Sequence, residues 1–481
     1  MTYIAQHWIG GEWTNSATGR QADSYDPATG KVIGRYADAS ADDAAGAIAA
    51  AKNVFEATDW AHQPRLRERV LLEMADRIER DAAPLAELLT ADNGKLIAES
   101  KGEIAATVSE LRYYAGLARN IFGRITELEP GLFASLHREP LGVAGIIVPW
   151  NAPLILAVRS LAPALAAGCT AVVKTAPQTA LVSERMFRLM SEAAGLPAGA
   201  INIFSESGSE GARALVSSPD VNIISYTGSS ETGKAIMAAA APTLKRINLE
   251  LGGSAPCILF DDADLDAAAP QLVRGGLFMA GQYCCSATRL LIHESILEKA
   301  LDRFKGALAN VVIGPGAATT SQMGPMVDAA GCARITSLVS RAKEAGARAV
   351  LDAERPSGPL AEGCFLTPGL YFADAPDNPV YTEEVFGPLL VADSFSDEDE
   401  AIAKANNSRF GLAASVWSHD LKQAQRVAQK IKAGTVWINS HGRTFAEIEN
   451  GGYKESGIGA LHGHEGLSAF LQTKHINWST N

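Results

Sequence analysis

Two adjacent cysteines, Cys284 and Cys285, stand in the segment GQYCCSATR and are the side chains best suited to nucleophilic chemistry. A cysteine attacks as its thiolate, and covalent catalysis also needs a base and donors for the oxyanion that forms. Two other segments offer such groups. Glu250 is a lone carboxylate at the end of an apolar run before a Gly-Gly pair, and the amide of Asn151 is held between two prolines in VPWNAPL.

A fourth segment, SYTGSSETGKA at residues 225–235, predicts a strand, a tight turn and the start of a helix. Backbone N–H groups at such a turn can bind a phosphate. Gly228 and Gly233 are five residues apart, which is not the GxGxxG spacing, so the turn alone is weak evidence. Alone, Glu250 would be a surface or capping residue and Asn151 a turn residue. All four features lie near strand ends or glycine turns, and together they predict an active site.

The elements that must position these residues alternate from Leu141 onward. The runs VAGIIVPW, TAVVK, INIFS and VNIISYTG predict strands, and the helices between them include one that ends at Gly168 and one with Ser183 as its N-cap. Such alternation predicts a parallel sheet that binds ligands beyond the carboxyl ends of its strands. Residues 41–120 predict helices, and a second strand–helix series begins near Pro256. We therefore expect two α/β domains with a shared cleft.

Composition excludes several classes of protein. A chain of 481 residues is too long for one core, and a net charge of −12 argues against a nucleic-acid partner. No basic and apolar leader or apolar run of ~20 residues is present, which predicts a cytoplasmic protein without a membrane partner. The six cysteines form no CxxC pair, and the two histidines of HGHE at 462–465 have no evident third ligand, so we expect reduced thiols and no metal.

Seven motifs follow one another in a fixed order along nearly the whole chain: PWNAP, ALAAGCTAVVK, YTGSSETG, LELGG, GQYCCSATR, EEVFGP and GGYKESG. In this the chain resembles the aldehyde dehydrogenase superfamily. The resemblance implies an α/β fold with a Rossmann-like coenzyme domain (residues 1–122 and 141–251), an α/β catalytic domain (252–457) and a small β oligomerisation element (123–140 and 458–481). It also implies a homodimer or homotetramer that oxidises a small-molecule aldehyde with NAD or NADP.

The resemblance also implies roles for the site residues. Cys284 would be the nucleophile, while Cys285 has no assigned role. The amide of Asn151 and the backbone N–H of Cys284 would stabilise the thiohemiacetal oxyanion, and Glu250 would activate the water that hydrolyses the thioester. The expected cofactor-binding residues are Trp150 and Ser229 by the pyrophosphate with Gly228 and Gly233 of the turn, Lys174 at the adenosine ribose, Glu384 at the nicotinamide ribose and Phe386 against the ring.

Two departures from the family pattern concern specificity. Pro177 stands where many relatives have a glutamate that binds the adenosine ribose, so both a contact to NAD and a repulsion against a 2′-phosphate are missing. We expect NAD, with NADP also possible. Glu449 and Asn450 replace the usual Pro-Phe before GGYK, which predicts a more polar substrate pocket.

Arg159 bears on the substrate. It lies eight residues after Asn151, about 12 Å along the same face of an otherwise apolar helix. It could pair with an acidic side chain elsewhere, or it could hold a substrate carboxylate, as an arginine at this position looks to do in succinate-semialdehyde dehydrogenases. Phe278 stands where those enzymes have a second arginine, and Phe278 and Tyr283 would equally suit a ring. We expect a polar or carboxylate-bearing aldehyde, contacted by Arg159, Phe278, Tyr283 and Asn450.

Three rival functions remain. A CoA-acylating aldehyde dehydrogenase uses a thiol in place of water, and Glu250 speaks against it because acylating relatives generally lack that base. A thiol esterase that works without a cofactor is opposed by the cofactor motifs. A protein without catalytic activity would not need the complete set of Cys284, Glu250 and Asn151.

Overall fold

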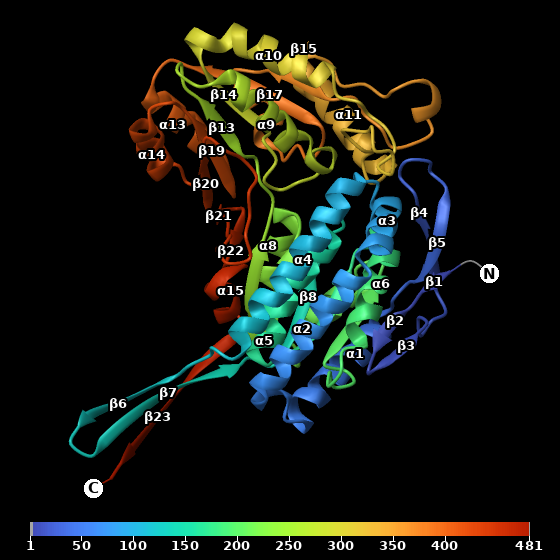
Figure 1. Ribbon diagram of the computed structural model, residues 1–481, viewed down its shortest axis with the longest axis vertical. Helices are drawn as coiled ribbons and strands as arrows, with labels where there is room; N and C mark the ends of the chain where they lie inside the picture. Colours follow the sequence, from blue (N-terminus) through green and yellow to red (C-terminus); the bar gives the residue numbers. More distant parts are fainter. Residues whose placement is uncertain (1–2, 481) are drawn as a thin grey trace.

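A computed structural model describes residues 3–480 as two sheets covered by helices, with one narrow arm (Figure 1). The first sheet has eight strands, and its five central ones, from β12 to β10, run parallel. Its order is β22 (Gly457–Ile458), β12 (Arg246–Glu250), β11 (Ile223–Thr227), β8 (Val143–Ile147), β9 (Thr170–Thr175), β10 (Ile201–Ser205), β2 (His7–Ile9) and β3 (Glu12–Thr14).

Helices from the first half of the chain pack around this sheet. They are α1 (Ala41–Ala57), α2 (Pro64–Arg80), α3 (Ala82–Asn93), α4 (Ile97–Ala118), α5 (Pro153–Ala167), α6 (Ala180–Ser191), α7 (Glu210–Ser217) and α8 (Ser230–Ala240). Every residue of β8 is buried, as expected for a parallel strand covered on both faces. Helix α5 ends where predicted, because Gly168 adopts a φ of 102° as its C-cap.

The predicted start of α6 is wrong. The helix begins at Ala180 with Thr179 as its N-cap residue, and Ser183 is buried inside the helix. The reason is the short 3-10 turn η2 (Pro177–Thr179), which begins at a proline whose fixed φ already suits a helical turn. Thr179 closes this turn with a non-helical backbone, and α6 starts at the next residue, three residues before Ser183.

The second sheet forms the upper part of Figure 1 and has seven strands. Its order is β15 (Arg348–Leu351), β16 (Gly369–Phe372), β17 (Leu389–Phe395), β14 (Arg289–His293), β13 (Pro256–Leu259), β19 (Ala413–Trp417) and β20 (Thr435–Ile438). Its helices are α9 (Leu265–Leu277), α10 (Leu297–Ala309), α11 (Ala329–Glu344), α12 (Pro379–Thr382), α13 (Glu398–Asn406) and α14 (Leu421–Lys430). The two predicted α/β series thus form two separate sheets, while the residue boundaries of the domains stay a prediction.

The arm is a three-stranded antiparallel sheet that projects from the lower part of the molecule (Figure 1). It contains β6 (Arg124–Glu129), β7 (Leu132–Pro140) and the C-terminal β23 (Leu471–Ser479), which follows α15 (Gly463–Ser468). Smaller elements are β1 (Ile4–Ala5), β4 (Gln21–Tyr25), β5 (Val32–Ala37), β18 (Phe410–Gly411), β21 (Tyr453–Lys454) and the 3-10 turns η1 (Trp60–His62), η3 (Ala241–Thr243), η4 (Phe278–Gly281), η5 (Glu294–Ile296) and η6 (Gly358–Leu360). No helix within residues 3–480 is long and apolar enough to cross a membrane.

Candidate active site

The thiols of Cys284 and Cys285 differ in burial and in pKa. The Sγ atoms of Cys284 and Cys285 are 3.9 Å apart, and Cys285 is the more deeply buried. A hydrogen bond from the Cys285 thiol lowers the pKa of Cys284, and the charge of Arg159 lowers it further, while burial opposes both. The same hydrogen bond, together with burial, raises the pKa of Cys285. Negative charge is therefore favoured on Cys284, with Cys285 as its protonated neighbour.

A strained turn places Cys284. In η4, Met279 and Ala280 have φ values of 51° and 55°, a region that residues other than glycine rarely adopt. The backbone N–H of Met279 donates to Oε1 of Glu99 at 2.8 Å, and the side chain of Gln282 donates to the Met279 carbonyl at 3.0 Å. These bonds hold the turn in a conformation that the chain would otherwise avoid.

Glu250 is the last residue of β12, beside Thr227 of β11. It is buried, and burial raises the pKa of its carboxyl to about 7, although the charge of Arg159 acts in the opposite direction. Its Oε1 atom has no hydrogen-bond partner in the described part of the chain. A carboxyl group with a pKa near neutrality and a free oxygen is suited to take a proton from water.

Asn151 follows β8 and reaches the cysteine loop, where its Nδ2 donates to the carbonyl of Gln282 at 3.0 Å. Its own carbonyl accepts a bond of 2.6 Å from Nζ of Lys95. Lys95 forms an ion pair with Glu103 in which the side chains are 0% and 1% exposed, and Glu103 also accepts from the backbone N–H of Leu154 at 2.8 Å. Sequence analysis missed Lys95 and Glu103, which have no distinctive local pattern.

A cavity of about 850 Å³ opens beside these groups. Its walls include the predicted residues Asn151, Arg159, Phe278, Tyr283, Cys284 and Asn450, together with Cys285 and His462, which were not predicted to line the site. Glu250 is not part of these walls. The rings of Phe278 and Tyr283 meet edge to face at 5.3 Å. Arg443, a cation seven residues before Asn450 in the chain, is exposed and is not part of the walls.

Arg159 is 5% exposed and does not form the ion pair that was one of its two predicted roles. Its Nη2 donates to Oγ1 of Thr227 at 3.0 Å, while its Nε has no partner in the described part of the chain. No acidic side chain of residues 3–480 lies within ion-pair distance of its guanidinium. A buried cation with an unused donor therefore lines the cavity, which is an arrangement suited to an anionic ligand.

Glu384 and Phe386, expected at the nicotinamide ribose and ring, lie close to the cysteine loop, and Trp150, expected by the pyrophosphate, lies beside Phe386. Trp150 and Phe386 pack edge to face at 5.6 Å. Oε1 of Glu384 accepts from the backbone N–H of Gly253 at 3.1 Å, and burial raises the pKa of Glu384 to about 7. Sequence analysis missed Arg334, which donates to the carbonyls of Glu384, Val385 and Phe386 at 3.2, 2.6 and 2.9 Å.

The predicted phosphate-type turn joins β11 to α8. Ser229 is the N-cap of α8 and accepts from the backbone N–H of Thr232 at 3.3 Å. A Cβ at Gly233 would lie 2.7 Å from the Leu251 side chain, so glycine lets the helix approach the strand. The backbone N–H of Gly228 donates to the carbonyl of Glu250 at 3.0 Å, which links this turn to the strand that carries the buried carboxyl.

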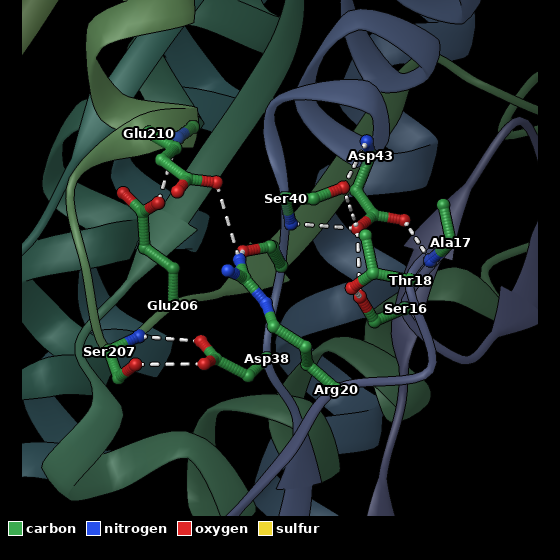
Figure 2. Close-up of polar contacts among 12 residues, drawn as sticks. Ser16, Ala17, Thr18, Arg20, Asp38, Ser40, Asp43, Glu206, Ser207 and Glu210 are labelled. Carbon is green, nitrogen blue, oxygen red and sulfur yellow. Dashed lines mark hydrogen bonds and ion pairs between the residues drawn. The ribbon is translucent and has the colours of Figure 1, made fainter.

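Lys174 lies near the end of β9, and burial lowers its pKa, while the charges of Glu206 and Asp38 partly offset that effect. Both carboxylates are held in place. Asp38 accepts from the N–H and the hydroxyl of Ser207 at 2.7 and 2.8 Å (Figure 2), and Glu206 accepts from the N–H of Gly211 at 2.8 Å. Position 177 carries no carboxylate, but the carboxylates of Glu206 and Asp38 lie close to Lys174.

The sequence of this chain is similar to those of known aldehyde dehydrogenases. The model of the aldehyde dehydrogenase family matches residues 13–476. A betaine aldehyde dehydrogenase of Bacillus subtilis is 38% identical over 98% of this chain and 97% of its own length, and a phenylacetaldehyde dehydrogenase of Pseudomonas fluorescens is 37% identical over 98% and 95%.

The fold agrees as closely as the sequence. A crystal structure of betaine aldehyde dehydrogenase from Staphylococcus aureus in complex with NAD+ superposes with a TM-score of 0.97 at 38% identity, covering 99% of this chain and 95% of that one. This confirms the predicted fold, including a coenzyme sheet, a second α/β sheet and a small β arm. The chain therefore belongs to the aldehyde dehydrogenase family.

Proposed function

We propose that the protein oxidises an aldehyde to the carboxylic acid with NAD through a thioester on Cys284. The observation that carries this proposal is that Cys284 and Asn151 line one cavity, that Glu250 is close enough for its charge to act on Cys284, and that negative charge is favoured on Cys284. An assay of the purified protein against a panel of aldehydes, with NAD and NADP in parallel, tests it. Absence of NADH or NADPH formation with every aldehyde would contradict the proposal.

In the first step, the Cys284 thiolate adds to the carbonyl carbon of the aldehyde, and the carbonyl oxygen becomes an oxyanion. The second hydrogen of the Asn151 amide and the backbone N–H of Cys284 are the donors we assign to that charge. NAD, when bound, supplies the hydride acceptor. Its fit rests on the Ser229-capped turn for the pyrophosphate and on Glu384 beside the cysteine loop.

In the second step, Glu250 takes a proton from a water molecule, which then attacks the thioester carbon and releases the acid and the Cys284 thiolate. The unpartnered Oε1 of Glu250 supports this role, since it leaves an oxygen free for that water. The presence of this base also favours hydrolysis of the thioester over transfer of the acyl group to coenzyme A. A cofactor-independent esterase would not require the turn at 228–233 or Glu384.

The cofactor preference is the first prediction. The Staphylococcus aureus relative binds NAD+, and we expect NAD to be preferred here as well. Since Pro177 supplies no carboxylate, the ratio of kcat/KM for NAD over NADP is expected to stay below roughly 100, because a charge repulsion of a few kcal/mol is missing. A ratio in the thousands would contradict this and would point to Asp38 or Glu206, which Asp38→Asn would then test.

We propose that Arg159 holds a carboxylate or another polar group of the substrate. Its guanidinium lies in the wall of the cavity, and no acidic side chain of residues 3–480 forms an ion pair with it. Relatives named betaine aldehyde dehydrogenases act on a quaternary ammonium aldehyde, a cation that this arginine would repel. An anionic or neutral polar aldehyde therefore suits this cavity better.

The second prediction tests whether Arg159 binds the substrate's carboxylate, a role called the clamp below. Because arginine and a carboxylate form a bidentate pair, Arg159→Ala is expected to raise KM for a carboxylate-bearing aldehyde at least about tenfold more than for a neutral aldehyde of similar length. Succinate semialdehyde and pentanal form a suitable pair, with betaine aldehyde as the cationic control. Equal changes in KM for the first two, or a strong native preference for long aliphatic aldehydes, would refute the clamp.

We further propose that the protein forms a homodimer or homotetramer through the arm of β6, β7 and β23. The arm projects from the body and exposes Ile125 and Leu128, which are 67% and 59% accessible (Figure 1). An isolated three-stranded sheet with apolar exposed residues gains stability when a partner covers it. Light scattering of the purified protein is expected to give the mass of two or four chains, and a monomer would contradict the proposal.

A further inference from the structure

His462 has an unusual backbone conformation. It precedes α15 with φ 63° and ψ 174°, in a region that is populated almost only by glycine because a Cβ clashes with the backbone there. A residue with a side chain stays in this region only where its surroundings hold it. Such strained residues cluster at functional sites, so an imidazole at this position calls for a function.

Glu110 of α4 is the group that holds His462. The Nδ1 atom of the ring lies 2.9 and 3.0 Å from the two carboxylate oxygens of Glu110, and the two side chains are 9% and 2% exposed. The hydroxyl of Tyr114, also in α4, donates to the carbonyl of Gly463 at 3.2 Å. Helix α4 therefore fixes both the ring and the backbone beside it.

The other ring nitrogen faces a different environment. Nε2 of His462 has no hydrogen-bond partner within residues 3–480, and it is not among the buried polar atoms that lack one. His462 lines the same cavity as Cys284 and Arg159. A carboxylate can only accept hydrogen bonds, so Nδ1 carries the hydrogen, and Nε2 is the ring atom that remains for a ligand; without a proton it is an acceptor.

We propose that His462, oriented by Glu110, is a specificity residue that accepts a hydrogen bond from a hydroxyl group of the aldehyde substrate. The proposal rests on the function proposed above and narrows its substrate class to hydroxyl-bearing aldehydes. The wall carboxylates Glu99 and Glu103 already accept hydrogen bonds from within the protein, and other polar groups of the wall offer donors. Arg159 has an unused N–H, and Asn450 uses its Oδ1 for Thr435 and keeps its amide N–H groups. His462 is thus the acceptor that complements these donors.

A purely structural role accounts for less of the geometry. An ion pair that only joined α4 to the segment before α15 would need neither an open ring nitrogen nor a position in the cavity wall. A metal site is also not supported, since no group of three or more His, Cys, Asp or Glu residues is arranged to hold an ion in the described part of the chain.

The experiment compares matched pairs of aldehydes that differ by one hydroxyl: hydroxyacetaldehyde with acetaldehyde, lactaldehyde with propanal, and para-hydroxybenzaldehyde with benzaldehyde. The quantity measured is the ratio of kcat/KM within each pair for the full-length protein with NAD. His462→Asn removes the ring and leaves a shorter polar side chain at the same strained position. Glu110→Gln removes the carboxylate that fixes the tautomer. His464→Asn changes an exposed histidine of the same segment and is the matched control.

The wild-type protein is expected to prefer the hydroxylated member of at least one pair. His462→Asn should lower that ratio about tenfold or more, since an acceptor built for a hydroxyl discriminates strongly against its absence. Glu110→Gln should lower it less, and His464→Asn should not change it. No hydroxyl preference in any pair, or an equal loss for both members in His462→Asn, would overturn the proposal. Failure of the wild-type protein to oxidise any aldehyde would instead overturn the proposed function, and this inference with it.

Discussion

Replacement of Cys284 by serine is expected to abolish aldehyde oxidation, with a fall in kcat of at least roughly 10⁴-fold, the scale seen when a covalent nucleophile is removed. Serine lacks a thiolate, and its hydroxyl has a far higher pKa than a thiol, so the attacking anion would not be populated at neutral pH. Cys285→Ser is expected to keep most of the activity, because serine still offers a donor to the Cys284 thiolate. Steady-state NADH formation measures both variants.

Cys285→Ala is the informative control for this pair. It removes the hydrogen bond that most strongly lowers the pKa of Cys284, so the rise of activity with pH should move to higher pH. If instead Cys285→Ser were inactive and Cys284→Ser active, the assignment of the nucleophile would be wrong. Alkylation with iodoacetamide followed by peptide mapping gives an independent measure of which thiol reacts first.

Replacement of Glu250 by glutamine should separate the two chemical steps. Hydride transfer needs the thiolate and the oxyanion donors, and it should still occur once, whereas hydrolysis of the thioester should slow by roughly 10²–10⁴-fold, as expected for loss of an acid–base group. Stopped-flow absorbance would show a burst of NADH followed by a slow steady state. Wild-type turnover in this variant would refute the role of Glu250.

The pH dependence of hydrolysis should follow the same carboxyl. Burial raises the pKa of Glu250 to about 7, and only the ionised form can accept a proton from water. The hydrolysis rate is therefore expected to rise as the pH increases through about 7 and to fall below it, and Glu250→Gln should lose this limb. Asp92→Asn is a matched control, because burial also raises the pKa of Asp92 to about 7, yet its carboxylate accepts from Ser24 and Val182 outside the cavity.

Much of the fold of this protein could be predicted from the sequence alone, because the patterns that specify its strands and helices are local. Strands covered on both faces need continuous apolar runs, helices end at residues such as Gly168, and parallel strands place their following residues at one edge of a sheet. Trp150, Asn151, Gly228 and Glu250 all lie at or after such strand ends. The order of the seven motifs then indicated the family, which the comparisons confirm.

Local patterns were not enough where two signals competed. Ser183 has the side chain of an N-cap residue, yet Pro177 starts the helical turn earlier and the serine is buried inside α6. The sequence also left two roles open for Arg159. Its surroundings exclude the ion pair, because Thr227 of a neighbouring strand is its hydrogen-bond partner and no carboxylate of the described residues pairs with it, while contact with the substrate stays a prediction.

Only the tertiary structure showed the groups that tune the site. Lys95 contacts the carbonyl of Asn151 across 56 residues of sequence, and His462 meets Glu110 across 352. Each of these residues is an ordinary charged or polar residue in its own segment, and its cost of burial is offset only by a partner that folding brings from elsewhere. The sequence by itself determined the family and the fold and predicted the reacting groups, because these depend on local pattern and motif order. The surroundings of Arg159 and His462 were decided by contacts between distant segments, since burial and pairing exist only in the folded chain.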